Sequence, residues 1–274
     1  MAEKRPVALS IAGSDPSGGA GIQADLKTFH QHGVYGGAVV SLLTVQNTQR
    51  LARVEVVSAD LVAAQLNAVI ADLHVAAIKT GALGSAEVVD AVADSLAGRA
   101  IPLVIDPVRI ASHGAALLED GARAALIERL MPLAHLITPN AAEAEWLTGR
   151  AVRSVADAER AAGELLAAGA RAVLLKGGHL DAQDAVDVYA VGAERLLLRA
   201  PRAPDVARHG LGCSLSAAIT ARLARGEQLL DACRAAKAWL RAAMQSAPAI
   251  GAGRRPVDHF ASLPSALEEE DRAR

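Results

Sequence analysis

Short apolar runs alternate with longer, amphipathic and alanine-rich segments along the whole sequence. The short runs have the length and character of buried strands, and the longer segments repeat apolar residues at helical spacing. The pattern predicts strands at Val7–Ala12, Ala38–Thr44, Val54–Val57, Ala76–Lys79, Leu103–Asp106, Leu136–Thr138, Ala172–Leu175, Val186–Val191 and Arg195–Arg199. It predicts helices at Gly21–Gln31, Ala59–Asp72, Ala86–Leu96, Gly121–Met131, Ala141–Thr148, Val155–Ala168, Cys213–Ala224 and Gln228–Ser246.

Strands that alternate with helices indicate an α/β protein with a mostly parallel sheet and helices on both of its faces. The segment from Val186 to Arg199 is different, because two alternating runs are joined by Gly192-Ala193-Glu194, which predicts an antiparallel hairpin. No linker-like stretch divides the chain. We therefore expect one domain over residues 1–274, with about 265–274 forming a charged, flexible tail.

Composition narrows the possible functions. Hydrophobic residues make up 52% of the chain and aromatic residues only 2%, which disfavours a surface that stacks nucleic-acid bases. The formal charge is −2, with scattered basic residues, and no apolar stretch is long enough to span a bilayer. Two cysteines are too few for a disulfide framework. We expect a cytoplasmic protein that binds neither nucleic acid nor membranes.

Polar residues and glycines gather where six predicted strands end. Turns alone would require Gly, Pro and Asn, but they would not require the Asp, Gln and Lys that recur beside them. In open α/β sheets, ligands bind outside the carboxyl ends of the strands, so we interpret these segments as one ligand crevice. The segments are Gly13–Gly21, Gln46–Thr48, Lys79–Gly81, Asp106–Pro107, Thr138–Asn140 and Lys176–His179.

The segment His209–Ser216 has glycines directly before a predicted helix. Free backbone N–H groups and the helix dipole make such a start an anion-binding hole, which phosphoryl transfer requires. Cys213 in the first turn would gain thiolate character there and could take a substrate proton, or it could be a small buried hydrophobe. The chain has no Gly-x-x-x-x-Gly-Lys-Ser/Thr segment, so it is not a P-loop kinase.

Four other polar residues leave alternatives open. Asn140 and Glu143 share a helix face and could hold Mg²⁺ through its water shell, or they could form a capping pair. Lys176 could pair with a phosphate or only extend its ammonium group to solvent. Asp106 before Pro107 could contribute to metal or nucleotide electrostatics, or only initiate a turn.

Two further residues are candidates for contacts to a substrate ring. Asp25, in an early predicted helix, could bind a ring amine or hydroxyl, or be solvated surface. Gln46 can both donate and accept hydrogen bonds at a heterocycle edge, or it could satisfy a loop backbone.

Together these segments resemble hydroxymethylpyrimidine/phosphomethylpyrimidine kinases of the ribokinase-like superfamily. The specific blocks are Ala12–Thr28 and Gly210–Cys213, and the matches at Gln46-Asn47-Thr48, Lys79-Thr80-Gly81, Asp106-Pro107-Val108, Ile137–Asn140 with Glu143, and Lys176–His179 are supportive. The resemblance implies a three-layer αβα sandwich and MgATP as the phosphoryl donor. It implies two successive phosphorylations of 4-amino-5-hydroxymethyl-2-methylpyrimidine in thiamine biosynthesis, and it makes a homodimer plausible.

The resemblance also implies roles for particular residues. The pyrimidine pocket would contain Gly13, Ala20, Asp25, Gln46 and Val108. Cys213 matches the position where most of the superfamily has an aspartate base, and the backbone of Gly210, Leu211, Gly212 and Cys213 would form the anion hole. Asn140 and Glu143 match a metal–phosphate motif, and Lys176 matches a phosphate contact.

The sequence departs from the usual family pattern at four positions. Leu211 replaces a small residue or Thr, and Arg208 replaces Thr. Ala82 and Arg109 each stand where Met is usual, and the first of those methionines lies against the substrate. The loss of two apolar side chains and the gain of a guanidinium at Arg109 could reshape the pocket or add a phosphate clamp. We hypothesise that the preference for the ring or the phosphate differs from that of typical members. A pyridoxine/pyridoxal-type kinase and a non-catalytic pyrimidine-binding relative are the alternatives.

Overall fold

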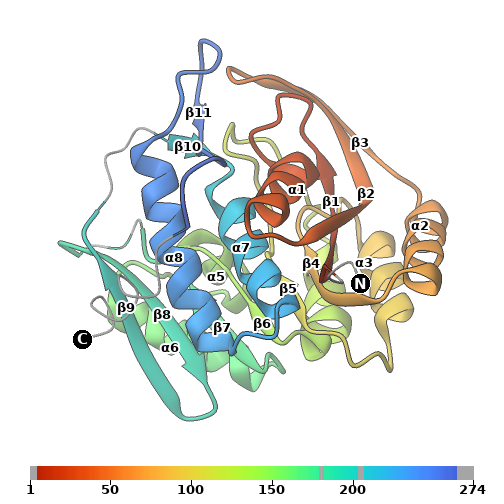
Figure 1. Cartoon of the computed structure of the whole chain (residues 1–274). Helices are drawn as coiled ribbons and strands as arrows, with labels where there is room; N and C mark the ends of the chain where they lie inside the picture. The colour runs from red at the N-terminus through yellow and green to blue at the C-terminus, as the bar shows by residue number, and fades with distance from the viewer. Residues whose placement is uncertain (1–4, 179, 181, 203–206, 264–274) are drawn as a thin grey trace.

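The computed structural model describes residues 5–178, 180, 182–202 and 207–263, so the tail expected from about residue 265 lies outside the described residues. One sheet of nine strands crosses the molecule in the order β3-β2-β1-β4-β5-β6-β7-β8-β9 (Figure 1). Its strands are β1 Val7–Ser14, β2 Tyr35–Gln46, β3 Leu51–Val56, β4 Val75–Thr80, β5 Leu103–Ile105, β6 Leu136–Ile137, β7 Ala172–Leu175, β8 Ala185–Val191 and β9 Glu194–Ala200.

The six central strands, from β2 to β7 in sheet order, are parallel, and antiparallel strands close both edges. β3 pairs with β2 at one edge, and the β8–β9 hairpin follows β7 at the other. The predicted hairpin is therefore confirmed. Two short strands form a separate pair, β10 Ala207–His209 with β11 Arg255–Pro256. The sequence analysis missed this pair because two or three residues are too few to show an alternating pattern.

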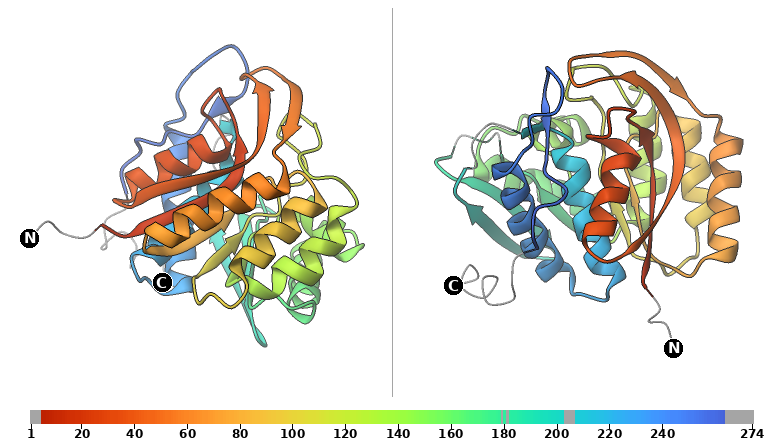
Figure 2. Two further views of the ribbon diagram at one scale, coloured as in Figure 1. Left: turned by 90° about the vertical axis from the view of Figure 1, so that its right-hand side faces the viewer. Right: turned by 45° about the horizontal axis from the view of Figure 1, so that its top comes forward.

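Helices cover both faces of the sheet, as the two turned views show (Figure 2). One face packs against α2 Ala59–Asp72, α3 Ala86–Leu96, α4 Ala122–Ala125, α5 Ala141–Thr148 and α6 Val155–Ala167. The other face packs against α1 Gly21–Gln31, α7 Leu211–Ala224 and α8 Leu229–Gln245. Successive strand residues serve opposite faces: Leu103 and Ile105 belong to the first core and Val104 to the second. The predicted three-layer αβα fold is thus confirmed.

Two predicted helices differ from the observed ones by more than one residue at an end. The helix predicted over Gly121–Met131 is α4 followed by a π-helical turn at Leu126–Leu130 and a 3₁₀ turn at Met131–Leu133. Pro132 has no backbone N–H to donate, so the α-helical pattern cannot continue through it. Helix α7 begins at Leu211, two residues before the predicted start at Cys213, because Gly210 at φ +74° provides its N-terminal cap.

Candidate active site

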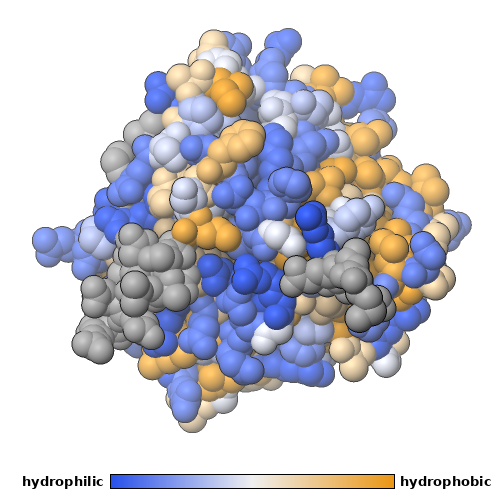
Figure 3. Space-filling view, in the orientation of Figure 1, coloured by the Kyte–Doolittle hydropathy of each residue, from blue (hydrophilic) through white to orange (hydrophobic). Residues whose placement is uncertain are grey.

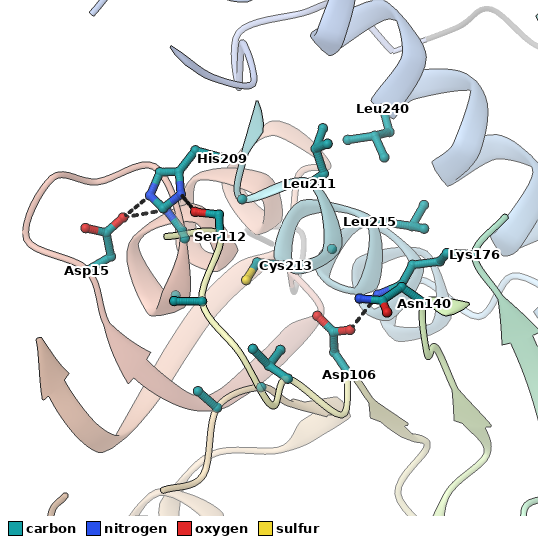
Figure 4. A pocket seen from close by; sticks show the side chains of 18 of the residues that line it. Asp15, Asp106, Ser112, Asn140, Lys176, His209, Leu211, Cys213, Leu215 and Leu240 are labelled. Atoms are coloured by element: carbon teal, nitrogen blue, oxygen red, sulfur yellow. Dashed lines mark hydrogen bonds and ion pairs between the residues drawn. The ribbon is translucent and has the colours of Figure 1, made fainter. Parts of the chain in front are cut away.

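A cavity of about 730 Å³ lies at the carboxyl ends of the parallel strands and reaches the N-terminus of α7 (Figure 4). Its wall comes from segments far apart in the sequence, which converge because parallel strands end at the same edge of the sheet. Of the predicted site residues, it is lined by Gly13, Ala20, Gln46, Ala82, Asp106, Val108, Asn140, Glu143, Lys176, Gly210, Leu211, Gly212 and Cys213. Asp25 and Arg109 do not line it.

The start of α7 has the backbone geometry that the predicted anion hole requires. The N–H of Ser214 bonds the Gly210 carbonyl, so the N–H groups of the three residues before it have no partner within the helix. Gly210 needs its left-handed φ, and any side chain there would collide with the Gly19 carbonyl oxygen. The last glycine, Gly212, lies over an ion pair, since a Cβ on it would be 3.1 Å from Lys176 Nζ. The contact between Gly210 and Gly19 shows that the start of α7 lies directly against the backbone of the Gly-rich segment Gly13–Gly21.

Lys176 is the cation beside this hole. Its Nζ lies 2.8 Å from Asp106 Oδ1 and 3.7 Å from Glu143 Oε2. Burial by itself would lower the pKa of Lys176, but the two carboxylates raise it above its usual value, so the ammonium is charged at neutral pH. The backbone N–H of Lys176 bonds the Pro139 carbonyl at 2.8 Å, which fixes it beside the start of α5. A positive charge and the free N–H groups of α7 thus face the same part of the cavity.

Asn140 and Glu143 form the capping pair that the sequence analysis weighed against a metal site. Asn140 Oδ1 accepts from the Glu143 N–H at 2.9 Å, and Glu143 Oε2 accepts from the Asn140 N–H at 2.8 Å. Both residues also line the cavity. Burial raises the pKa of Glu143 to about 7, against the opposing effect of Lys176.

The donors near Lys176 suit a magnesium ion held largely by water and phosphate. No group of three or more His, Cys, Asp or Glu side chains positioned to hold a metal occurs among the described residues. Asp106, Glu143 and Asn140 offer hard oxygen atoms on one side of the cavity, which are the ligands Mg²⁺ prefers. Mg²⁺ usually takes one or two carboxylates and keeps several waters, so this set fits it.

Cys213 lies in the cavity wall, in the first turn of α7. Burial raises the pKa of its thiol to about 12, although the nearby Lys79 ammonium and a backbone hydrogen bond from Gly21 act in the opposite direction. The expectation that the helix start gives this cysteine thiolate character is therefore wrong for the structure as described. The thiol carries its proton at neutral pH.

Asp25 is the clearest correction among the candidate residues. It has no exposed surface, and its Oδ1 lies 2.7 Å from Nζ of Lys79, which is equally buried. The hydroxyl of Ser10 donates to its other carboxylate oxygen at 2.6 Å. Asp25 is thus neither solvated surface nor part of the cavity wall, because both side chains of the pair are fully buried.

Arg109 is the second correction. Val108 and Ile110 line the cavity, and Arg109 between them is directed elsewhere. Its guanidinium lies 2.9 Å from Asp120 and 5.5 Å from the centroid of the Trp146 ring. The guanidinium therefore anchors the base of the 108–120 loop against α5 and forms no phosphate clamp. Ala82 is buried at the cavity wall, and the Arg208 side chain is outside what the structure describes.

A network around His209 was not found by sequence reasoning. His209 Nε2 lies 2.7 Å from Asp15 Oδ2 and 3.2 Å from Gln46 Nε2, and its Nδ1 lies 3.0 Å from Ser112 Oγ (Figure 4). The only indication of this network in the sequence is the position of its members. His209 directly precedes Gly210 at the start of α7, and Asp15 lies in the first Gly-rich segment.

The opposite end of the cavity is mainly apolar. Leu211, Leu215 and Leu240 extend toward it from α7 and α8 (Figure 4), and Met244 completes this wall. Lys237 at its edge lies 2.7 Å from Asp187. The cavity therefore has polar side chains around His209, free helix N–H groups at the start of α7, and a leucine-lined side at α7 and α8 that also carries Lys237 and Arg241.

Fold and site together define a small-molecule phosphotransferase of the ribokinase-like type, with a glycine-rich helix start instead of a P-loop. A family model described as phosphomethylpyrimidine kinase matches residues 15–258. The hydroxymethylpyrimidine/phosphomethylpyrimidine kinase of Rhizobium meliloti is 51% identical over 257 residues, which is 93% of this chain and 97% of the relative. The chain belongs to the phosphomethylpyrimidine kinase family.

Solved structures show the same fold. Phosphomethylpyrimidine kinase from Clostridium difficile 630 matches with a TM-score of 0.76 at 39% identity, covering 86% of this chain and 98% of that one. An ADP complex of Bacillus subtilis pyridoxal kinase matches with a TM-score of 0.87 at 37% identity, covering 94% and 98%.

Proposed function

We propose that this chain transfers the γ-phosphoryl group of ATP to the hydroxymethyl group of 4-amino-5-hydroxymethyl-2-methylpyrimidine, to its monophosphate, or to both, in thiamine biosynthesis. One observation carries the proposal: a single cavity is lined by the polar residues around His209, by the start of α7 with its free N–H groups, and by the leucines of α7 and α8. The acceptor and the phosphates would then meet at the start of α7, where the attacking oxygen, the phosphorus and the leaving oxygen must lie roughly in line.

In this arrangement the phosphates bind at the start of α7 and beside Lys176. Backbone N–H groups and the ammonium stabilise negative charge on the transferring group, which is the main catalytic requirement of phosphoryl transfer. Asp106, Glu143 and Asn140 would hold Mg²⁺. When bound, Mg²⁺ neutralises charge on the phosphate oxygens and orients them.

Cys213 contacts the acceptor hydroxyl in this proposal. With its proton on, the thiol can hold the hydroxyl in position; to act as a base it must first lose that proton, which the nearby charge of Lys79 favours. The two roles differ in magnitude. Loss of a general base lowers the rate by about a hundredfold or more, whereas loss of a positioning contact costs less.

The test is ATP consumption with the aminopyrimidine alcohol, with its monophosphate and with pyridoxine, for the native chain and for Cys213→Ala. Turnover of the pyrimidine with a loss of about a hundredfold or more in the variant supports both the function and the base role. A smaller loss assigns Cys213 to positioning. If pyridoxine is the preferred acceptor, the proposed substrate is wrong, but the proposed site for phosphoryl transfer stands.

A pyridoxal-type kinase is the second candidate, and the higher TM-score of the Bacillus subtilis pyridoxal kinase favours it. The greater identity of the Rhizobium meliloti pyrimidine kinase favours the first candidate. A non-catalytic binder is disfavoured, because Lys176 and the α7 start are both in place.

We propose further that residues 1–274 form a single kinase domain. We also propose that the protein works in the cytoplasm and forms a homodimer. No helix in the described part of the chain is long and apolar enough to cross a membrane. Apolar side chains gather over β2, β3 and α2, where Leu43, Val45, Val56 and Leu61 are exposed (Figure 3). Light scattering would give a dimer mass for the native chain and a monomer mass for Leu43→Lys with Val45→Lys; a native monomer would refute the dimer.

A further inference from the structure

The carboxylate of Asp187 joins three elements at the edge of the cavity. Asp187 lies in β8, is only 6% exposed and lines the cavity wall. Its Oδ1 accepts from the Gly177 N–H at 2.9 Å, and its Oδ2 lies 2.7 Å from Nζ of Lys237 in α8. Lys237 also donates to the Ala185 carbonyl at 3.2 Å, which holds its ammonium group against β8. One buried side chain therefore connects the end of β7 with β8 and α8.

The Gly177 N–H lies beyond the backbone ladder of the sheet. The pairing of β7 with β8 ends at Leu175 and Val188. Gly177 comes two residues later, and its backbone passes so close to β8 that a side chain on it would collide with the Val186 carbonyl oxygen. A buried N–H that has no ladder partner needs another acceptor. The carboxylate of Asp187 is that acceptor.

Lys176 is held through the peptide groups on both sides of it. Its own N–H bonds the Pro139 carbonyl at 2.8 Å, and the next N–H, that of Gly177, bonds Asp187. Because peptide groups are planar, fixing both of them fixes the backbone dihedrals of Lys176 and hence the direction of its side chain. That side chain carries the ammonium group to 2.8 Å from Asp106, beside the start of α7.

We propose that Asp187 is a positioning residue, which fixes the ammonium group of Lys176 at the phosphate site by holding the Gly177 N–H. Asp187 does not bind the phosphates itself, because a carboxylate repels them. Lys237 offsets this negative charge and holds one carboxylate oxygen toward α8, which leaves the other for Gly177. The inference rests on the proposed function, since Lys176 faces phosphates only if the chain binds a nucleotide.

Two substitutions at Asp187 separate positioning from charge. Asp187→Asn keeps an oxygen for the Gly177 N–H and removes the charge, whereas Asp187→Ala removes both. We expect Asp187→Ala to weaken binding of the ATP analogue AMP-PCP with Mg²⁺ by about tenfold or more and to lower kcat by about tenfold or more, because the ammonium group is displaced from the phosphates. Asp187→Asn should recover most of kcat. It should bind AMP-PCP within about threefold of the native affinity, or more tightly, since Lys237 then has no counter-charge.

Asp157→Ala is the matched control. Asp157 also accepts from backbone N–H groups, those of Arg153 and Ser154, and pairs with Arg160, but it does not line the cavity. This variant should lower the urea midpoint and leave binding of AMP-PCP unchanged. If Asp187→Ala likewise changes only the urea midpoint, the positioning role is refuted. It is also refuted if Asp187→Asn loses as much affinity and kcat as Asp187→Ala, because the charge and not the acceptor would then matter.

Calorimetric binding of AMP-PCP requires no acceptor, so the role of Asp187 can be tested apart from the proposed substrate. A native chain that binds AMP-PCP but phosphorylates no pyrimidine would refute the proposed function alone, and the affinities of the Asp187 variants would still decide the positioning role. A native chain that does not bind AMP-PCP would refute both.

Discussion

The buried Asp25–Lys79 pair predicts a large loss of stability in Asp25→Asn. The two charged atoms lie 2.7 Å apart and neither side chain is exposed. Removing the carboxylate leaves the ammonium without its counter-charge in the interior, which costs about 3–5 kcal/mol in comparable buried pairs. A loss of this size lowers the folding equilibrium constant by roughly two to nearly four powers of ten and Tm by about 5–9 °C.

Urea unfolding of four variants would measure this. Asp25→Asn and Lys79→Met each remove one partner, and Asp25→Leu with Lys79→Met removes both. We expect the double variant to be less destabilised than Asp25→Asn, because no uncompensated charge remains. Glu55→Gln is the control: it breaks the exposed Arg53–Glu55 pair and should change stability by about 1 kcal/mol or less.

Activity of the folded variant decides between a structural role and a substrate contact. Because Asp25 is absent from the cavity wall, we expect KM for the acceptor in Asp25→Asn to stay within about threefold of native, a difference of less than one ordinary hydrogen bond. If Asp25→Asn has an unchanged urea midpoint and a strongly raised KM for the acceptor, the reasoning is refuted. Asp25 would then be a contact in the pyrimidine pocket.

Three further variants test the α7 start, Glu143 and Arg109. Gly210→Ala should lower kcat by about a hundredfold or more, as loss of an oxyanion-type donor does, because the new Cβ would displace the Gly19 backbone. Gly226→Ala is the control: Gly226 also has a positive φ, but a Cβ there meets no atom within 4 Å, so only stability should change. Equal kcat values in the two variants would contradict this. Because the pKa of Glu143 is raised to about 7, its carboxylate forms as pH rises through 7. Activity at limiting Mg²⁺ should therefore rise around pH 7. The free energy of unfolding should fall between about pH 4.5 and 7, because the folded state holds a proton that the unfolded state has lost. Glu143→Gln should abolish both pH effects, and a pH profile unchanged in this variant would show that Glu143 causes neither. Arg109→Met should leave KM for ATP and acceptor within about twofold and lower stability by about 1 kcal/mol or less, and a large rise in KM for ATP would restore the clamp hypothesis.

Local patterns were sufficient for most of the architecture and for the position of the site. Helices α1, α2, α3 and α5 match their predicted bounds, because helix formation depends mainly on residues within a few turns of one another. The carboxyl ends of parallel strands meet at one edge of the sheet, so the sequence could predict that Gln46, Asp106 and Lys176 line the same crevice. Where local signals were short or interrupted, as at β10, β11 and Pro132, the prediction failed.

The sequence by itself determined the α/β layering, the glycine-lined start of α7 and the crevice above the strands, because periodicity, glycine geometry and sheet topology are local or general rules. Only the tertiary structure decided that Asp25 is paired with Lys79, 54 residues away, and that Asp15 is paired with His209, 194 residues away. It also decided that Arg109 turns from the cavity and that Cys213 keeps its proton. Charge partners and burial depend on which distant segments pack together, and no spacing along the chain encodes them directly.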